Sequence, residues 1–107
     1  SGVVTVLSTS GENAFSNYPN PFGEEVPETR FVFWADAPGT AEIKIYTLMG
    51  GLVWSKSEPV PTGGQIYDGL IRWNGFNDNR KQVLNGVYIA ILKLNGKTYK
   101  TKVAYIK

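Results

Sequence analysis

Apolar and polar residues alternate with a period of two along most of the chain, a pattern typical of β-strands that are buried on one face. The segments that carry it are TRFVFWA (29–35), AEIKIYT (41–47), LIRWNG (70–75), VYIAILKL (87–94) and KTYKTKVAYI (97–106). Because successive side chains of a strand point to opposite faces, each segment directs one row of side chains toward a core. We expect this core to contain Phe31, Phe33, Ile43, Ile45, Trp73, Tyr88 and Leu92.

Turn-forming residues separate these segments. DAPGT (36–40) and MGG (49–51) are turns by composition, the second leading into a strand at LVWSKS, and Asn95-Gly96 is a strong hairpin signal. PVPTGGQIYDG (59–69) has no periodicity and predicts a long loop, whereas NDNRKQVLNG (77–86) predicts a series of turns. With a short first strand at Val3 to Leu7, about seven strands result, which predicts an all-β, immunoglobulin-like, two-sheet antiparallel β-sandwich.

The composition agrees with a single β-domain and argues against several kinds of function. The 107 residues include 12 Gly and 6 Pro, and no segment is apolar enough to span a bilayer. The net charge of +2 gives no overall field for nucleic acid. Because the chain has no His and no Cys, it lacks the common general base, the common nucleophile pairs and thiolate metal ligands. We therefore predict that it is not an enzyme.

Two clusters of polar side chains remain as candidates for chemistry. Glu24, Glu25 and Glu28 share one proline-flanked loop, where solvated carboxylates are expected rather than a catalytic pair held across a cleft. A second cluster offers oxygen ligands for Ca²⁺, but it has only one charged member and lacks the spacing of a calcium loop. Its members are Asn74, Asn77, Asp78 and Asn79. We predict no catalytic, cofactor-binding or metal-binding residue, and no cofactor.

Four apolar side chains fall on the outward phase of their strands: Val32, Trp34, Ile89 and Ile91. If their strands are neighbours, these side chains form an exposed patch of the kind that marks an interaction surface. Trp54 could join this face or cap the edge of the sandwich. A flat aromatic surface also suits a sugar, but the aliphatic company of Trp34 favours contact with protein, since sugar sites also carry polar groups. The four residues are our candidate partner surface.

The C-terminal segment is basic. It carries Lys93, Lys97, Lys100, Lys102 and Lys107 with no acidic residue among them. Alternation places Val103 and Tyr105 on one side of the last strand and Lys100 and Lys102 on the other, so one side can pack while the other is presented to a partner. The alternative interpretation is an edge strand whose lysines prevent edge-to-edge association.

NYPNPF (17–22) places two prolines one residue apart before the first clearly alternating segment. Each proline fixes its own φ and pushes the preceding residue into extended geometry, so we expect a stiff, polyproline-like segment that does not lie inside a sheet. A ligand for a proline-recognising domain is disfavoured, because the Pro-x-x-Pro spacing is absent at Pro19 and Pro21.

Taken in order, NYPNPF, FVFWADAPGTAEIKIYTLMGGLV, IRWNGFNDNRKQVLNGVYIAILKL and KTKVAYIK resemble the immunoglobulin-like C-terminal module of the flagellar hook-capping protein and of proteins secreted by type IX systems. The resemblance covers residues 17–107 and rests on the order and spacing of several short motifs. These are Pro19-Asn20-Pro21, Ile45-Tyr46, Gly50, Trp73, Gly75, Asn77-Asp78, Gly86-Val87-Tyr88 and Lys102 to Lys107.

The chain departs from the family pattern at its turns. Thr47 and Asn74 stand where the family usually has Asp, and Gly51 replaces a common Arg. We expect an Asx-type cap to persist at Asn74 and the contribution of the Asp to be lost at Thr47.

The resemblance implies domain boundaries and a function. Residues 1–16 form an N-terminal lead-in, residues 17–107 form the module, and the Pro-Asn-Pro segment separates the module from whatever precedes it. The implied role is a non-catalytic C-terminal module of a secreted or cell-surface protein, recognised as a sorting signal by outer-membrane export machinery. The candidate sorting-signal face is Lys100, Lys102 and Lys107.

The implied partners are the secretion machinery or the preceding domain of the same polypeptide. The alternative function is a carbohydrate-binding or domain-docking accessory module of a secreted hydrolase, with a polysaccharide as a partner. A third interpretation is a scaffold domain of the hook cap. It is weaker because that protein needs flanking helical segments for assembly, and the sequence predicts none.

Overall fold

The computed structural model describes residues 15–107, and every regular element in that range is a β-strand. The strands are β1 (Phe15–Tyr18), β2 (Phe22–Gly23), β3 (Thr29–Ala35), β4 (Gly39–Tyr46), β5 (Leu52–Val60), β6 (Gln65–Trp73), β7 (Gly86–Leu94) and β8 (Lys97–Ile106). Over these residues no helix is long and apolar enough to cross a membrane. The strand predicted at Val3 to Leu7 lies outside the described residues.

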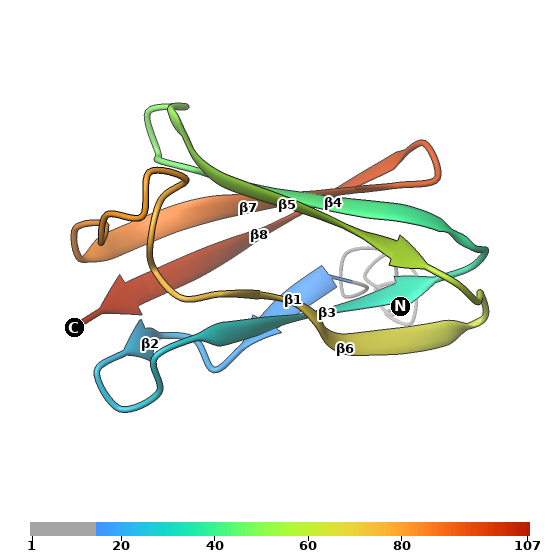
Figure 1. Cartoon of the computed structure of the whole chain (residues 1–107), viewed down its shortest axis with the longest axis horizontal. Coiled ribbons are helices and arrows are strands. Elements are labelled where there is room, and N and C mark those ends of the chain that lie inside the picture. Colours follow the sequence, from blue (N-terminus) through green and yellow to red (C-terminus); the bar gives the residue numbers. More distant parts are fainter. Residues whose placement is uncertain (1–14) are drawn as a thin grey trace, which may run out of the picture.

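The strands form two sheets that pack face to face (Figure 1). The three-stranded sheet has the order β1-β3-β6, and the five-stranded sheet has the order β2-β8-β7-β4-β5. Neighbouring strands are antiparallel except β2 and β8, which pair in parallel at Phe22 and Gly23. The predicted all-β sandwich is confirmed. Six of the seven strands predicted for an antiparallel sandwich correspond to β3 to β8, whereas β1, β2 and the short parallel pair were not predicted.

β6 begins earlier than the alternation indicated. The predicted loop 59–69 contains the end of β5 and the first half of β6, so the connection between these strands is only residues 61–64. The pairing of β3 with β6 shifts register between Arg30 and Val32, and Gly69, in the shifted stretch, has a φ of 87°. The bulge sets Gly69 to Ile71 of β6 opposite Phe31 and disrupts the ladder locally. Because Gly69 has no side chain and Ile66 is exposed, this half of the strand lacks a regular apolar row toward the core, and the alternation missed it.

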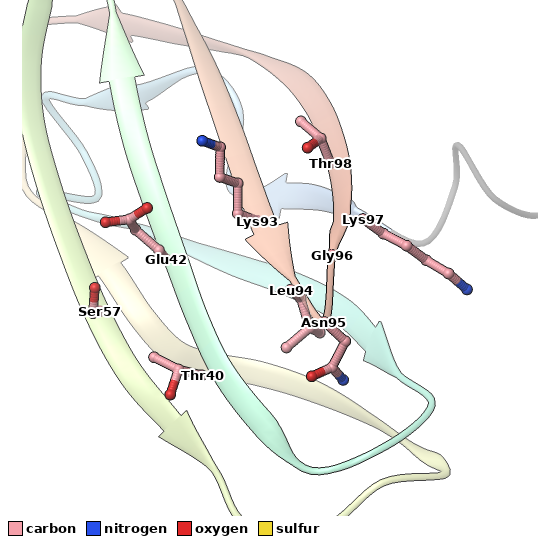
Figure 2. A pocket seen from close by; sticks show the side chains of 9 residues that line it. All are labelled: Thr40, Glu42, Ser57, Lys93, Leu94, Asn95, Gly96, Lys97 and Thr98. Carbon is pink, nitrogen blue, oxygen red and sulfur yellow. The ribbon is translucent and has the colours of Figure 1, made fainter.

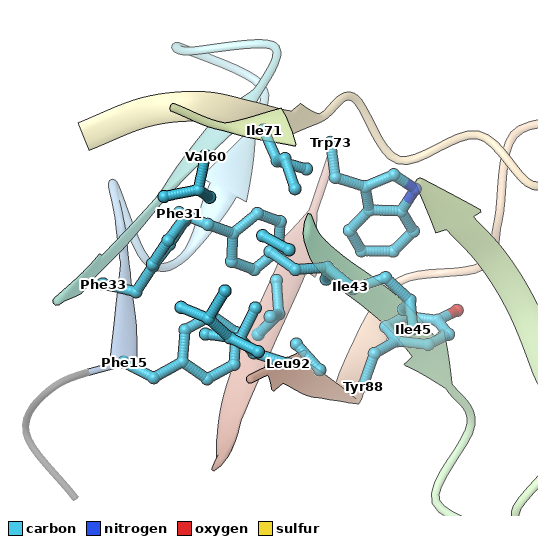
Figure 3. Packing of buried hydrophobic residues seen from close by; sticks show 14 of the residues in the cluster. Phe15, Phe31, Phe33, Ile43, Ile45, Val60, Ile71, Trp73, Tyr88 and Leu92 are labelled. Carbon is cyan, nitrogen blue, oxygen red and sulfur yellow. The ribbon is translucent and has the colours of Figure 1, made fainter. Parts of the chain in front are cut away.

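The core lies between the two sheets and contains all seven residues that were predicted to be buried (Figure 3). Trp73 is completely buried, and its ring centroid lies 5.6 Å from those of Phe22 and Tyr88. Its indole N–H donates a hydrogen bond of 2.8 Å to the carbonyl of Phe76, so the polar group of this buried ring is satisfied. The predicted strand phase is therefore confirmed.

The chain turns sharply after Trp73, and Gly75 permits the turn. Gly75 has a φ of 83°, and a Cβ at this position would lie 2.5 Å from Cε1 of Tyr105. The Oδ1 atom of Asn74 accepts a hydrogen bond of 3.2 Å from the backbone N–H of Phe76, which confirms the predicted Asx-type cap. The corner of the module is thus held by its own side chains.

The prediction that the β4–β5 turn loses the contribution of an aspartate at position 47 is wrong. The hydroxyl of Thr47 accepts a hydrogen bond of 3.0 Å from the backbone N–H of Gly51. Two backbone hydrogen bonds also close the turn, from Thr47 N–H to the Gly51 carbonyl (2.9 Å) and from Gly50 N–H to the Thr47 carbonyl (2.9 Å). A threonine hydroxyl therefore provides the local acceptor that an aspartate would otherwise supply.

The Pro-Asn-Pro segment is a crossover inside the domain, so the prediction of a stiff lead-in before the domain is wrong. β1 precedes the segment and pairs with β3 in one sheet, whereas β2 follows it and pairs with β8 in the other. The boundary predicted at residue 17 falls within β1, and Phe15 is already part of the core. The Tyr18–Pro19 and Asn20–Pro21 peptide bonds are both cis.

The crossover is anchored to the last strand by Asn20. The Nδ2 group of Asn20 donates to the carbonyl of Lys102 (3.1 Å), and its Oδ1 accepts from the N–H of Ala104 (2.8 Å). The hydroxyl of Thr29 donates to the carbonyl of Pro19 (2.8 Å) and holds the other side of the crossover. The local rules for proline did not predict this arrangement, because the contacts of Asn20 span more than eighty residues. Together with β2, Asn20 covers the edge of β8 near its end.

Candidate functional site

The four residues of the predicted partner surface do not form one patch. Val32 and Trp34 lie on β3 in the three-stranded sheet, whereas Ile89 and Ile91 lie on β7 in the five-stranded sheet. Their side chains alternate with core residues, so each pair lies on the outer face of its own sheet, on opposite sides of the sandwich. The prediction required neighbouring strands, and alternation alone does not say to which sheet a strand belongs.

The outer face of the three-stranded sheet has an exposed apolar pair and paired charges. Trp34 is 45% exposed and is the register partner of Ile66 on β6, which is 63% exposed. Beside them, Arg30 lies over the ring of Tyr18 at 5.2 Å and contacts Asp68 at 2.8 Å. Arg72, next along this face, contacts Glu28 at 3.1 Å. Both arginines of this face are therefore already bound to carboxylates.

Trp54 caps the edge of the sandwich and does not join Trp34. It is partly buried, and its ring centroid lies 6.3 Å from that of Trp73. It is the register partner of Ile45, which is fully buried, so it belongs to the inner side of the five-stranded sheet. The two tryptophans thus lie in different sheets, and they do not provide a common platform for a sugar.

The outer face of the five-stranded sheet brings together residues from both predicted sets. Ile89 is the register partner of Lys102, and Ile91 is the register partner of Lys100. On the other side of β7, Lys44 is opposite Ile91. Two isoleucines of the candidate partner surface therefore lie next to two lysines of the candidate sorting-signal face.

We call the surface formed by Lys44, Lys93, Lys100, Lys102, Ile89 and Ile91 the basic face. It spans β4, β7 and β8, with β7 as the middle strand. Lys107, the third residue of the candidate sorting-signal face, follows the end of β8 and lies outside it. The backbone N–H of Lys107 donates a hydrogen bond of 3.0 Å to Oδ1 of Asn85, which fixes the end of the chain beside the β6–β7 connection.

A hollow of about 600 Å³ lies at one end of the basic face, beside the β7–β8 hairpin (Figure 2). Its lining includes Glu42 and Lys93, which are register partners on β4 and β7, and the hydroxyl residues Thr40, Ser57 and Thr98. Lys97 also borders the hollow, but its side chain extends away from the others in Figure 2 and contacts Asp36 at 3.4 Å. The hollow is polar and extends the basic face toward the hairpin.

Groups with a shifted pKa have separate local causes. The hydrogen bond and the charge of Lys97 hold the pKa of Asp36 below its usual value. Hydrogen bonding to the Thr62 side chain lowers the pKa of Tyr67, and burial raises the pKa of Tyr88. These shifts reflect contacts within the fold, and none of the three groups belongs to the basic face.

The asparagine-rich loop uses its oxygen atoms for its own backbone. The Oδ1 atom of Asn77 accepts hydrogen bonds from the N–H groups of Asn79 (2.8 Å) and Lys81 (3.0 Å). Across residues 15–107, no group of three or more Asp, Glu, His or Cys side chains is arranged to hold a metal ion. In the same range every buried side-chain nitrogen or oxygen atom has a hydrogen-bond partner. The side chains of this loop thus stabilise the turn.

Sequence reasoning missed Lys44 and Lys93 as members of the basic face. Both occupy outward positions of strands whose alternation was recognised, so the direction of each side chain was available. What was missing was the strand order, which places β7 between β4 and β8.

Comparison with known proteins identifies similar folds. No protein-family model and no curated protein sequence matches the chain. The chain is similar to part of a solved structure of PorZ, an essential bacterial surface component of the type IX secretion system of Porphyromonas gingivalis. The TM-score is 0.64 and the sequence identity is 24%, and the match covers 94% of this chain and 12% of PorZ. Dimeric latent PorU from the same organism is similar with a TM-score of 0.63 and 19% identity over 86% of this chain and 9% of PorU. The chain thus spans a small part of either protein, and the likeness is one of fold.

Proposed function

We propose that this chain is a non-catalytic module of a larger secreted or cell-surface protein and acts as a sorting signal for type IX secretion. The observation that carries the proposal is the fold match to part of PorZ, a surface component of that system, over 94% of this chain. The motif resemblance of residues 17–107 supports the same assignment from different evidence. The partners we propose are the outer-membrane export machinery and the preceding domain of the same polypeptide.

The last strand suits recognition by a partner. Val103 and Tyr105 of β8 are buried in the core, whereas Lys100 and Lys102 are exposed on the opposite side. β7 holds one edge of the strand, and β2 and Asn20 hold the other edge near its end. A partner would therefore bind lysines on an ordered backbone, so that little conformational entropy is lost on binding.

A domain-docking module is the second candidate, and the exposed pair Trp34 and Ile66 favours it. Adjacent exposed apolar side chains of this size are typical of surfaces that contact another protein. In this proposal the preceding domain packs on the three-stranded sheet. The carbohydrate-binding alternative has less support, because Trp54 packs against Trp73 and does not lie beside Trp34.

Export of a reporter protein tests the proposed function. The reporter is fused in front of the chain and produced in a bacterium with a type IX system, and its location is compared with that of a fusion lacking residues 103–107. We expect the complete fusion at the cell surface or in the medium and the truncated fusion in the periplasm. Equal export of the two fusions would contradict a sorting role.

The truncation also removes buried residues, so a second variant is needed. Lys100→Gln with Lys102→Gln leaves Val103 and Tyr105 in place, and exposed substitutions of this kind change the free energy of unfolding by about 0.5 kcal/mol or less. The thermal unfolding of each fusion protein, followed by circular dichroism, separates failed export from failed folding.

A further inference from the structure

The lysines of the basic face have no ion-pair partner in the described part of the chain. Between residues 15 and 107, the cations in ion pairs are Arg30, Lys56, Arg72 and Lys97, and none of these belongs to the basic face. Among the outward residues of β4, β7 and β8, only Glu42 is acidic. The outward side of these three strands thus carries four lysines and one acid, on a protein whose net charge is only +2.

The lysines lie close enough together to act as one positive surface. Lys44 and Lys100 lie on the two strands that flank β7, so their backbones are separated by two strand spacings, about 10 Å. This distance is comparable to the Debye length of about 8 to 10 Å at physiological salt. The side chains therefore produce a combined field that favours an anionic partner.

The middle of the basic face is apolar. Ile89 and Ile91 are half-buried neighbours on β7, and Tyr46 and Ala104 lie beside them with similar exposure. Lysine stems bordering such a strip can cover apolar surface while their ammonium groups remain in water. The face thus offers contacts for apolar side chains in its middle and for anions along its borders.

This combination fits a protein segment that carries both carboxylates and aliphatic side chains. A sugar site normally has an aromatic platform with polar groups around it, and the exposed Trp34 lies on the other sheet. A single-stranded nucleic acid is bound by several aromatic side chains on which successive bases stack, whereas Tyr46 is the only aromatic residue among the outward positions of β4, β7 and β8. Ile89 and Ile91 are half-buried, which favours contact with side chains laid across the sheet over insertion into a bilayer.

We infer that the basic face is a docking surface for an acidic segment of a partner protein, in which carboxylates contact the lysines and aliphatic side chains contact Ile89 and Ile91. This inference deepens the proposed sorting function and rests on it for the identity of the process, but not for the binding chemistry. It assigns Lys44 and Lys93 to the recognised surface together with Lys100 and Lys102.

The test uses the complete chain labelled with ¹⁵N and a fluorescein-labelled peptide in which glutamate alternates with leucine and valine. We expect saturable binding that weakens with salt, and amide shift changes on β4, β7 and β8 rather than on β3 and β6. Lys100→Gln with Lys102→Gln should weaken the binding about fivefold, because two exposed charge contacts are lost. The control Lys56→Gln with Arg72→Gln removes the same charge elsewhere and should leave the affinity unchanged.

Several results would overturn the inference. They are the absence of binding at low salt, equal binding of a peptide with glutamine in place of glutamate, and equal weakening by the control pair. Tighter binding of polygalacturonate or of phosphatidylglycerol vesicles than of the peptide would instead assign the face to a polysaccharide or a membrane. The peptide assay does not depend on export, so the two proposals can fail separately. If the peptide binds through the lysines but export of the reporter does not depend on the module, only the sorting function is contradicted. Module-dependent export without peptide binding contradicts only the docking surface.

Discussion

The two outer faces of this sandwich differ in whether their cations form ion pairs. On the three-stranded sheet, Arg30 and Arg72 are bound to Asp68 and Glu28. On the five-stranded sheet, the lysines of the basic face have no such partner among residues 15–107. Each arginine and its carboxylate neutralise one another within the fold, whereas unpaired lysines leave a positive charge for another molecule. The difference indicates which face is available for recognition by an anion.

The apolar residues of the two faces also differ, in their exposure and in their neighbours. Trp34 and Ile66 are strongly exposed, whereas Ile89 and Ile91 are half-buried and bordered by lysines. The first face therefore suits a broad apolar contact such as domain packing, and the second suits a partner that is both apolar and acidic.

Trp73→Ala should have the largest effect, because both faces depend on the same core. Removing the ring leaves a cavity among Phe22, Tyr88 and Tyr105, and should lower the free energy of unfolding by about 3 to 5 kcal/mol. Denaturant unfolding followed by circular dichroism measures this loss. A change below about 1 kcal/mol, the typical value for a point substitution, would show that Trp73 is not the centre of the packing.

Asn20→Ala should disturb the basic face without removing a core side chain. Two hydrogen bonds to β8 are lost, each contributing about 0.5 to 1.5 kcal/mol, so we expect a moderate loss of stability. Hydrogen exchange should become faster at the Ala104 amide, which donates to Asn20, while β6 amides keep their protection. Uniform acceleration over both sheets would mean that the crossover holds the whole sandwich rather than β8.

Neutralising one cation on each face should show that a paired arginine contributes to stability and that an unpaired lysine does not. Arg30→Gln removes an ion pair with Asp68 and should lower the free energy of unfolding by about 0.2 to 1 kcal/mol at low salt. Lys100→Gln removes repulsion among lysines and should leave stability within about 0.5 kcal/mol of the original. Thermal unfolding at low and high salt provides the measurement. A larger loss for Lys100→Gln than for Arg30→Gln would reverse the comparison.

The Asp36–Lys97 pair gives a pH test at the end of the hairpin. Lys97 lowers the pKa of Asp36 in the folded chain, so the contribution of this pair is present above the unfolded pKa of about 3.9 and is lost as the pH falls through the folded pKa. Lys97→Gln should raise the pKa of Asp36 toward its usual value. The carboxyl ¹³C shift of Asp36 reports the titration, and an unchanged midpoint in the variant would exclude Lys97 as the cause.

The sequence was sufficient for the sandwich and for its core because alternation distinguishes inward from outward side chains. It was insufficient where pairing is irregular or distant. The bulge near Arg30 concealed the first half of β6, and the contacts of Asn20 with β8 turned an expected lead-in into a crossover. The sequence predicted the isoleucines and the lysines of the candidate site as two separate sets, because alternation does not reveal that β7 lies between β4 and β8.

The central claim is that recognition uses the basic face rather than the opposite one, and matched double variants test it in the export assay. Lys100→Gln with Lys102→Gln and Arg30→Gln with Arg72→Gln each remove two positive charges, from the five-stranded and the three-stranded sheet respectively. With both fusions folded, we predict that the lysine pair reduces the exported fraction of the reporter and that the arginine pair leaves it unchanged. Equal export of the two variants, or a defect confined to the arginine pair, would contradict the claim.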